Sequence, residues 1–263
     1  MDTTQKRWID VRVKRQDGPD TPPYWHAFRV PWKPNHNVIS VLMEIRQNPV
    51  TTAGERVPAP AWEASCLEEV CGACTMVING GVRQACTALI DHYEQPITLE
   101  PASKFPVVRD LIVDRRRMFN ALKRVKAWIP VDGTYDLGPG PRMAPELQEL
   151  RYALSECITC GCCVEVCPQV HLEDGPEGFV GAAAIGQTLL QNLHPTGAMN
   201  KDERLGALMG PGGIEGCGNA QNCVQACPKE LPLTHAIAEI GRQTTLKWFR
   251  DVFRRFERKV GEP

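Results

Sequence analysis

The sequence lacks the features that mark several common classes of protein. Its charge is nearly balanced, with 30 lysines and arginines against 31 aspartates and glutamates, and aromatic residues make up only 6% of the chain. There is no basic patch interleaved with aromatic residues, so nucleic-acid binding is not expected. The longest apolar stretch, at residues 179–190, is broken by glycine, and it is shorter than the about 20 residues of a membrane-spanning helix.

The beginning of the chain does not resemble a secretion signal. Residues 1–15 are polar and charged, with neither an apolar core nor a small-residue cleavage site. We therefore expect a protein that is not secreted and is soluble by itself, although it could still dock on a membrane partner.

Cysteine, in contrast, is abundant, with 12 residues in a chain of 263. In a secreted protein this number would indicate disulfide bonds, but in a chain that stays inside the cell it favours metal binding. Eleven of the 12 fall into spacings typical of iron–sulfur cluster ligands.

The first group of cysteines has the spacing of a plant-type 2Fe–2S site. Four residues separate the first two cysteines, two residues the next two, and eleven residues precede the fourth. Soft, charged thiolates bind iron strongly, and Gly72 leaves room for backbone amides to approach the sulfurs. A structural zinc site is the alternative, but zinc ribbons favour two Cys-x2-Cys pairs. The predicted ligands are Cys66, Cys71, Cys74 and Cys86.

The second group matches a bacterial two-cluster ferredoxin, in which the fourth cysteine of each run serves the other cluster. The first run is Cys157-x2-Cys160-x2-Cys163-x3-Cys167-Pro168, and the second comprises Cys217, Cys223 and Cys227-Pro228. This exchange predicts a 4Fe–4S cluster on Cys157, Cys160, Cys163 and Cys227.

The remaining cluster is one thiolate short. Ala220 occupies the position that would repeat the two-residue spacing, and alanine cannot ligate iron. A cubane without one corner, a 3Fe–4S cluster, is therefore predicted on Cys167, Cys217 and Cys223. A 4Fe–4S cluster with water or another side chain at the open corner is the alternative. Cys162 is left over, and we expect a small buried apolar residue that points away from the cluster.

Apolar periodicity predicts a sheet in the first part of the chain. A helix over residues 37–47, with Asn37 as its N-cap, follows from apolar residues at helical spacing. Two strands, a helix and further strands around a cysteine loop fit a small ferredoxin-like β-grasp sheet. The predicted strands lie at residues 9–13, 25–30, 75–78 and 97–99.

The rest of the chain is predicted to be helical. Residues 111–128 look helical and basic, residues 132–142 form a Gly/Pro-rich loop near the domain boundary, and Pro145 suits the first turn of the next helix. The expected class is α+β. A plant-type ferredoxin β-grasp domain with the 2Fe–2S site spans residues 1–110, a connecting helix and loop span 111–144, and an all-α bacterial-ferredoxin-like domain spans 145–263.

The last segment predicts a basic amphipathic helix. It suits either a partner or membrane surface, or packing on its own domain. Its apolar face carries Leu246, Phe249, Val252, Phe253, Phe256 and Val260, and its basic face carries Arg250, Arg254, Arg255, Arg258 and Lys259.

The motifs, in this order, resemble the iron–sulfur subunit of succinate dehydrogenase and fumarate reductase over nearly the whole chain. They are Cys66-Leu-Glu-Glu-Val-Cys-Gly-Ala-Cys74, Phe105-Pro-Val-Val-Arg-Asp110 and Cys157-Ile-Thr-Cys-Gly-Cys-Cys163. Two further segments resemble the menaquinone-linked bacterial subgroup: Asp132-Gly-Thr-Tyr-Asp-Leu-Gly-Pro-Gly-Pro141 and Cys217-Gly-Asn-Ala-Gln-Asn-Cys223.

The resemblance implies an electron relay. In this family a separate flavoprotein oxidises succinate to fumarate on covalent FAD, and electrons pass through 2Fe–2S, 4Fe–4S and 3Fe–4S clusters to a quinone at a membrane cytochrome b anchor. For this chain it implies an FAD flavoprotein partner, a dihaem anchor, menaquinone near the 3Fe–4S cluster, and a peripheral position on the cytoplasmic face of the cell membrane.

The resemblance also implies that substrate chemistry lies elsewhere. The chain has no Gly-x-Gly-x-x-Gly motif and no obvious site for a substrate carboxylate, so no catalytic residue is assigned. It is expected to act as a subunit of a succinate dehydrogenase of the EC 1.3.5.1 class, within the tricarboxylic acid cycle and respiratory complex II.

One departure concerns the quinone. Mitochondrial-type relatives place tryptophans shortly after the counterpart of Cys167 and a histidine after that of Cys217. Here the segments read Gln169-Val170-His171-Leu172 and Gly218, so no quinone contacts are transferred, and an ordinary role is expected for His171.

Two other functions compete with this reading. An iron–sulfur subunit of another flavin oxidoreductase, of the glycolate or heterodisulfide type, would usually lack the 2Fe–2S domain in this position. A zinc protein without a redox role would contain neither iron nor acid-labile sulfide.

Overall fold

The computed structural model describes residues 7–129, 142–175 and 177–260. Internal contacts divide the chain into two compact units. Unit 1 consists of Met1–Arg115 together with Ile158–Glu165, and unit 2 consists of Arg116–Cys157 and Val166–Pro263. The loop predicted at residues 132–142 lies, apart from Arg142, outside the described residues.

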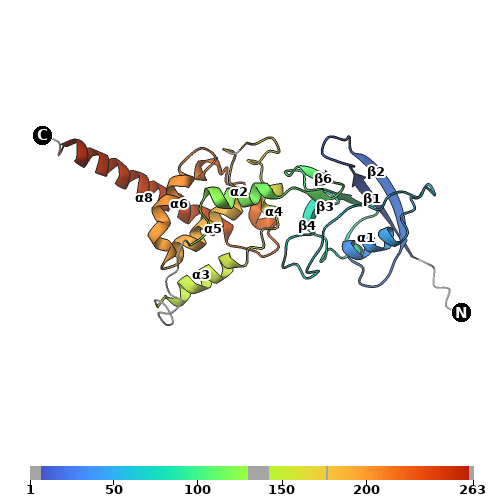
Figure 1. Ribbon diagram of the computed structural model, residues 1–263. Coiled ribbons are helices and arrows are strands. Elements are labelled where there is room, and N and C mark those ends of the chain that lie inside the picture. The colour runs from blue at the N-terminus through green and yellow to red at the C-terminus, as the bar shows by residue number, and fades with distance from the viewer. Residues whose placement is uncertain (1–6, 130–141, 176, 261–263) are drawn as a thin grey trace. The chain divides into compact units, whose positions relative to one another are not determined.

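Unit 1 is built on a mixed five-stranded sheet (Figure 1). Strand β1 runs antiparallel to β2 and parallel to β5, and β3 runs antiparallel to both β5 and β4. All four predicted strands are confirmed. Across the sheet the order is β2 (Tyr24–Pro31), β1 (Trp8–Arg15), β5 (Ile97–Glu100), β3 (Thr75–Ile78) and β4 (Gly81–Gln84).

Strand β4 was not predicted from the apolar pattern, because only one of its four residues is apolar. It pairs with β3 through a two-residue turn, in which Asn79 and Gly80 have φ angles of 46° and 79°. Such turns require left-handed backbone at both central positions, and Asn-Gly is their strongest sequence signal. That dipeptide could have predicted the hairpin.

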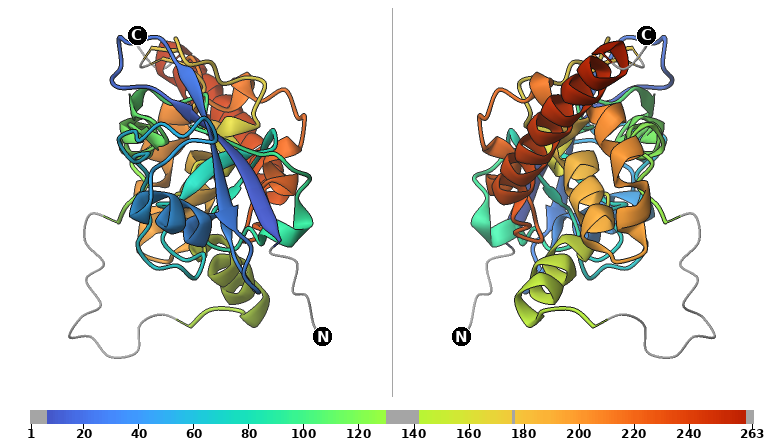
Figure 2. Two further views of the ribbon diagram at one scale, coloured as in Figure 1. Left: turned by 90° about the vertical axis from the view of Figure 1, so that its right-hand side faces the viewer. Right: turned by 90° about the vertical axis from the view of Figure 1, so that its left-hand side faces the viewer.

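Helix α1 (Val38–Gln47) confirms the predicted helix and its N-cap. The side chain of Asn37 accepts a hydrogen bond from the backbone N–H of Ser40 at 2.8 Å, which satisfies one donor of the first turn. The apolar positions of α1 and alternate residues of β1 and β2 are buried in one cluster, so the helix covers one face of the sheet (Figure 2). Members of this core include Val38, Val41, Leu42, Ile45, Ile9, Val11, Val13 and Phe28.

The helix predicted over residues 111–128 is shorter than expected. Strand β7 (Ile112–Val113), which pairs with β6 (Val107–Arg109), occupies its first part, and helix α2 spans only Arg116–Arg124. Leu111 is buried in the core of unit 1, which holds the chain in the sheet at this point. Lys126 takes a φ of 50°, a left-handed conformation that does not continue a helix.

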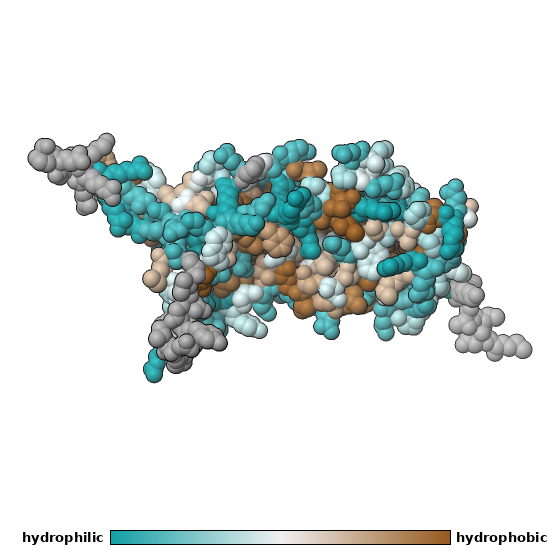
Figure 3. Space-filling view, in the orientation of Figure 1, coloured by the Kyte–Doolittle hydropathy of each residue, from teal (hydrophilic) through white to brown (hydrophobic). Residues whose placement is uncertain are grey.

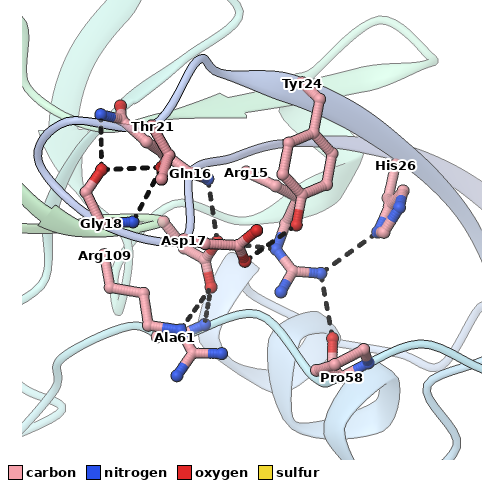
Figure 4. Close-up of polar contacts among 11 residues, drawn as sticks. Arg15, Gln16, Asp17, Gly18, Thr21, Tyr24, His26, Pro58, Ala61 and Arg109 are labelled. Atoms are coloured by element: carbon pink, nitrogen blue, oxygen red, sulfur yellow. Dashed lines mark hydrogen bonds and ion pairs between the residues drawn. The ribbon is translucent and has the colours of Figure 1, made fainter.

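A buried ion pair holds the end of β1 to the loop before the first cysteines (Figure 4). Arg15 Nε donates to Asp110 Oδ1 at 2.8 Å, and the two side chains are 1% and 0% exposed. Asp110 also accepts from the backbone N–H groups of Gln16 at 3.0 Å and Ala61 at 2.8 Å. Arg15 Nη1 donates to the carbonyl of Pro58 at 3.0 Å. The charges are thus compensated by each other and by backbone groups.

Unit 2 is helical and packs around α5 (Gly181–Leu193). This helix contacts α2, α3 (Pro145–Ser155), α6 (Lys201–Leu208) and α8 (Leu233–Val260). Pro145 lies in the first turn of α3, as predicted. Small residues on α5 permit close packing: a Cβ at Gly186 would stand 3.4 Å from Leu233. The short helices of this unit are η2 (Gly197–Asn200), η3 (Ile214–Gly216) and α7 (Asn222–Gln225).

The last helix, α8, extends beyond its packed part (Figure 1). Leu233, Ala236 and Ile240 are buried. Packing on its own domain therefore holds for the first part of the helix, whereas much of the predicted apolar face further along is not covered. The face of α8 that is visible in Figure 3 is largely hydrophilic. The exposed side chains of the helix include Leu246, Trp248, Phe249, Phe253 and Phe256. No helix in the described ranges is long and apolar enough to span a bilayer.

Candidate iron–sulfur sites

The loop of the first three cysteines is shaped to surround its sulfurs with backbone amides. Leu67, Glu69 and Gly72 take left-handed φ angles of 62°, 57° and 69°. The N–H groups of Glu68 and Val70 point at Cys66 Sγ, at 3.4 and 3.3 Å. Backbone donors aimed at a sulfur stabilise a thiolate, so the loop fits a cluster ligand better than a plain thiol.

The electrostatics of this loop differ between its rim and its interior. The N–H groups of Glu68 and Val70 lower the pKa of Cys66 to about 7. Burial instead raises the pKa of Cys74 to about 12. A ligand must be deprotonated, so the exposed rim favours the thiolate, whereas at Cys74 further donors or the metal itself must compensate for burial.

A segment distant in sequence packs directly on this loop within unit 1. A Cβ at Gly72 would stand 2.7 Å from Cys160 Cα and 2.8 Å from the carbonyl oxygen of Ile158. The hydroxyl of Thr75 lies 3.0 Å from the carbonyl oxygen of Gly72 and 2.9 Å from that of Cys160. Glycine is therefore required at position 72 both for the positive φ and for this close approach.

Helix α4 (Cys162–Glu165) continues this segment and is anchored in the same unit. Glu165 accepts hydrogen bonds from Ser103 Oγ at 2.7 Å and from the N–H of Lys104 at 3.0 Å. Cys162 is buried, as predicted, with 1% exposure. A hydrogen bond from Cys162 lowers the pKa of Cys160 to about 7, and the same contact, with burial, raises the pKa of Cys162. The contact therefore favours the proton on Cys162 and the charge on Cys160.

In unit 2, the three cysteines predicted for the 3Fe–4S cluster line one pocket. Burial raises the pKa of Cys223, and the neighbouring sulfurs of Cys167 and Cys217 raise it further. Ala220 lies in the same wall, so the position without a thiol faces the same space as the three cysteines. The pocket is lined by Cys167, Pro168, Gln169, Phe179, Ala182, Cys217, Gly218, Asn219, Ala220, Gln221, Asn222, Cys223, Thr234 and Ile237.

The other predicted ligand set includes residues from each unit. Cys160 and Cys163 belong to unit 1, and Cys157 and Cys227 belong to unit 2. All 12 cysteines lie within the described ranges, and none of them forms a disulfide bond. No three His, Cys, Asp or Glu side chains within the described ranges are arranged to hold a single metal ion.

His171 does not line the pocket of the second unit. Its residue is exposed, and its backbone N–H donates to Asp174 Oδ2 at 2.7 Å. The structure therefore places this histidine on the surface, which agrees with the ordinary surface or core position expected from the sequence.

Sequence reasoning missed two polar residues at the first site, Thr75 and Gln84. They are cross-strand partners at the open end of the β3–β4 hairpin and are buried, at 7% and 1% exposure. Neither has a metal-ligating side chain, so only a correct prediction of the hairpin could have placed them beside the cysteines.

Comparisons with known proteins agree with this arrangement. A family profile described as a 2Fe–2S iron–sulfur cluster binding domain matches residues 10–120, and one described as a 4Fe–4S dicluster domain matches residues 153–231. A ferredoxin-type 2Fe–2S domain followed by a helical two-cluster domain defines an iron–sulfur protein of electron transfer.

The relatives are more specific. The chain is 57% identical over 250 residues to the succinate dehydrogenase iron–sulfur subunit of Bacillus subtilis, covering 95% of this chain and 98% of that one. It is 29% identical to the fumarate reductase iron–sulfur subunit of Wolinella succinogenes, over 90% and 97% of the two chains. The chain belongs to the family of succinate dehydrogenase and fumarate reductase iron–sulfur subunits.

A solved structure shares the fold. One chain of the Mycobacterium smegmatis Sdh1 complex in the apo form superposes with a TM-score of 0.77 at 22% identity, covering 93% of this chain and 98% of that one. The α+β class, with a sheet domain followed by helices, is thereby confirmed.

Proposed function

We propose that this chain is the electron-transfer subunit of a respiratory succinate dehydrogenase/fumarate reductase of the EC 1.3.5.1 class. It takes electrons from an FAD-containing flavoprotein and passes them to menaquinone at a membrane cytochrome b. The clusters, when bound, supply one-electron transfer, and the chain positions them and sets their surroundings. The observation that carries the proposal is the amide-lined loop of Cys66–Cys74, together with a second pocket whose wall has three cysteines and an alanine.

The proposed ligand sets are those predicted from spacing. Four thiolates hold the 2Fe–2S cluster: Cys66, Cys71, Cys74 and Cys86. The proposed 4Fe–4S set comprises Cys157, Cys160, Cys163 and Cys227. The 3Fe–4S cluster is held by Cys167, Cys217 and Cys223, with Ala220 at the open corner. The domain limits at residues 110 and 144 likewise stay a prediction.

The partners follow from the family. A flavoprotein subunit and a membrane anchor are proposed. The likeness to the menaquinone-linked subgroup supports a dihaem cytochrome b as that anchor, which holds this chain peripherally on the cytoplasmic face of the cell membrane. The exposed apolar side chains of Phe249, Phe253 and Phe256 on α8 support docking to such a partner or to the membrane surface.

The identity of the third cluster is testable through Ala220. We expect the oxidised protein to show the EPR signal of a 3Fe–4S centre. Ala220→Cys should replace that signal by a 4Fe–4S centre, because the fourth iron gains a thiolate. Ala220→Val, which adds volume and no ligand, should retain the 3Fe–4S signal. An unmodified protein that already contains two 4Fe–4S clusters would show that the ligand count is wrong.

A further inference from the structure

The carboxamide of Gln84 lies between the sulfur of Cys74, a predicted 2Fe–2S ligand, and that of Cys162, which is predicted to bind no cluster. Its Oε1 is 3.5 Å from Cys74 Sγ, and its Nε2 is 3.5 Å from Cys162 Sγ and 2.7 Å from Thr75 Oγ1. The residue is 1% exposed. A buried carboxamide with three polar neighbours and no access to water has to satisfy its donors and its acceptor among those neighbours.

Loading the site with iron changes what these neighbours can do. As a thiol, Cys74 donates to Gln84 Oε1. As a cluster ligand it is a thiolate, which has no hydrogen and can only accept. The amide oxygen of Gln84 and the thiolate sulfur, 3.5 Å apart, would then face each other with lone pairs and no hydrogen between them. On the other side, Thr75 and Cys162 each carry a hydrogen that they can donate to an oxygen.

Rotation of the carboxamide by half a turn resolves the conflict. Oxygen and nitrogen exchange places, so the NH2 group faces Cys74 and Oε1 faces Thr75 and Cys162. Thr75 opposes this rotation, because its single hydrogen is also within reach of the carbonyl oxygens of Gly72 and Cys160. Hydrogen bonds to a charged acceptor are roughly twice as strong as neutral ones. The contact with the thiolate therefore decides the orientation.

We propose that Gln84 is a positioning residue of the 2Fe–2S site whose amide donates to Cys74 Sγ in the loaded protein and raises the reduction potential of that cluster. A donor aimed at a ligand sulfur stabilises the more negative, reduced cluster more than the oxidised one. This inference rests on the proposed 2Fe–2S ligand set. The inference also gives the β3–β4 hairpin a role, because the pairing of β4 with β3 places Gln84 beside the cysteines.

The first test is an EPR-monitored redox titration of the purified complex. Gln84→Met keeps the length of the side chain and removes the donor, so the 2Fe–2S midpoint should shift to lower potential. The 3Fe–4S midpoint, which depends on unit 2, should not move. Gln16→Met is the matched control, because it removes a carboxamide of unit 1 that donates to the carbonyls of Gly18 and Pro19, and it should leave both midpoints unchanged.

A second variant distinguishes the effect of the Gln84 amide from that of the neighbouring Thr75 hydroxyl. Thr75→Val removes the competing hydroxyl and leaves Gln84 in place, so the 2Fe–2S midpoint should not fall. An unchanged or raised midpoint in Gln84→Met would overturn the inference while the proposed function stands. Absence of any 2Fe–2S signal in the unmodified complex would instead contradict the proposed function.

A spectroscopic readout covers the case in which Gln84→Met does not assemble. Complex labelled with 15N at the glutamine side-chain amide should show a 15N coupling to the reduced 2Fe–2S cluster in pulsed EPR. The coupling should persist in Gln16→Met. It should be weaker or absent if Oε1 of Gln84, rather than its NH2 group, faces Cys74. A labelled, unmodified complex without this coupling would therefore refute the donor role directly.

Discussion

At the scale of single residues, the buried charges of Arg15 and Asp110 in unit 1 compensate each other. Arg15 and Asp110 are almost completely buried, and each also binds backbone groups of the loop that leads to Cys66. Taking such charges out of water is expensive, so the pair is stable only while both partners are present. The pair thereby links the stability of the sheet to the position of the cysteine loop.

We expect Asp110→Asn to destabilise the protein by about 3–5 kcal/mol, because it leaves the Arg15 guanidinium buried without a counter-ion. The exposed pair of Arg29 and Asp10, whose side chains are 57% and 39% exposed, is the matched control. Asp10→Asn should cost less than about 1 kcal/mol. Urea unfolding of both variants, followed anaerobically by circular dichroism, measures the difference, and equal losses would contradict the argument.

At the scale of elements, the start of α1 is tied to a predicted cluster ligand. The side-chain oxygen of Asn37 caps the helix at Ser40 N, while its Nδ2 donates to the carbonyl oxygen of Cys86 at 2.8 Å. One side chain thus connects the helix that covers the sheet with the fourth cysteine of the 2Fe–2S group. Helix stability and ligand position are therefore coupled through Asn37.

Two substitutions of Asn37 separate these roles. Asn37→Ala should destabilise the protein by about 1 kcal/mol through loss of the cap, and it should also alter the EPR line shape of the 2Fe–2S cluster. Asn37→Ser keeps a capping oxygen and removes the amide that donates to Cys86. We expect it to retain thermal stability while changing the line shape. If Asn37→Ser is as unstable as Asn37→Ala, the cap is not the stabilising contact.

At the scale of the whole molecule, the two compact units are not continuous segments of the chain. Ile158–Glu165 belongs with unit 1, although about forty residues of unit 2 precede it. The cysteine run of the second half is therefore shared between the units. Such long-range association cannot be read from local periodicity, because it depends on burial between segments far apart in the chain.

Assembly is tested on the intact complex. We expect a tagged chain, solubilised from membranes with mild detergent, to co-purify with a flavoprotein and a cytochrome b. Covalent flavin and haem absorbance in the eluate measure the two partners. Recovery of the chain alone, with all its clusters intact, would contradict the proposed assembly.

Local patterns were sufficient for much of this protein. Cysteine spacing is set by how a short loop wraps a cluster, so the proposed ligand groups rest on the order of residues alone. The same order predicted the buried position of Cys162. Helix α1 was predictable for a similar reason, since its periodicity and its cap at Asn37 lie within a dozen residues.

Tertiary structure decided what surrounds those sulfurs. Thr75 and Gln84 gain a role only because the β3–β4 hairpin and Ile158–Glu165 converge on Gly72. Hydrogen bonds and desolvation act over a few ångströms in space, regardless of separation along the chain, so neither the pKa of Cys74 nor the neighbours of Cys162 follow from spacing. The sequence by itself predicts the ligands, and the fold decides the electrostatic setting of their sulfurs.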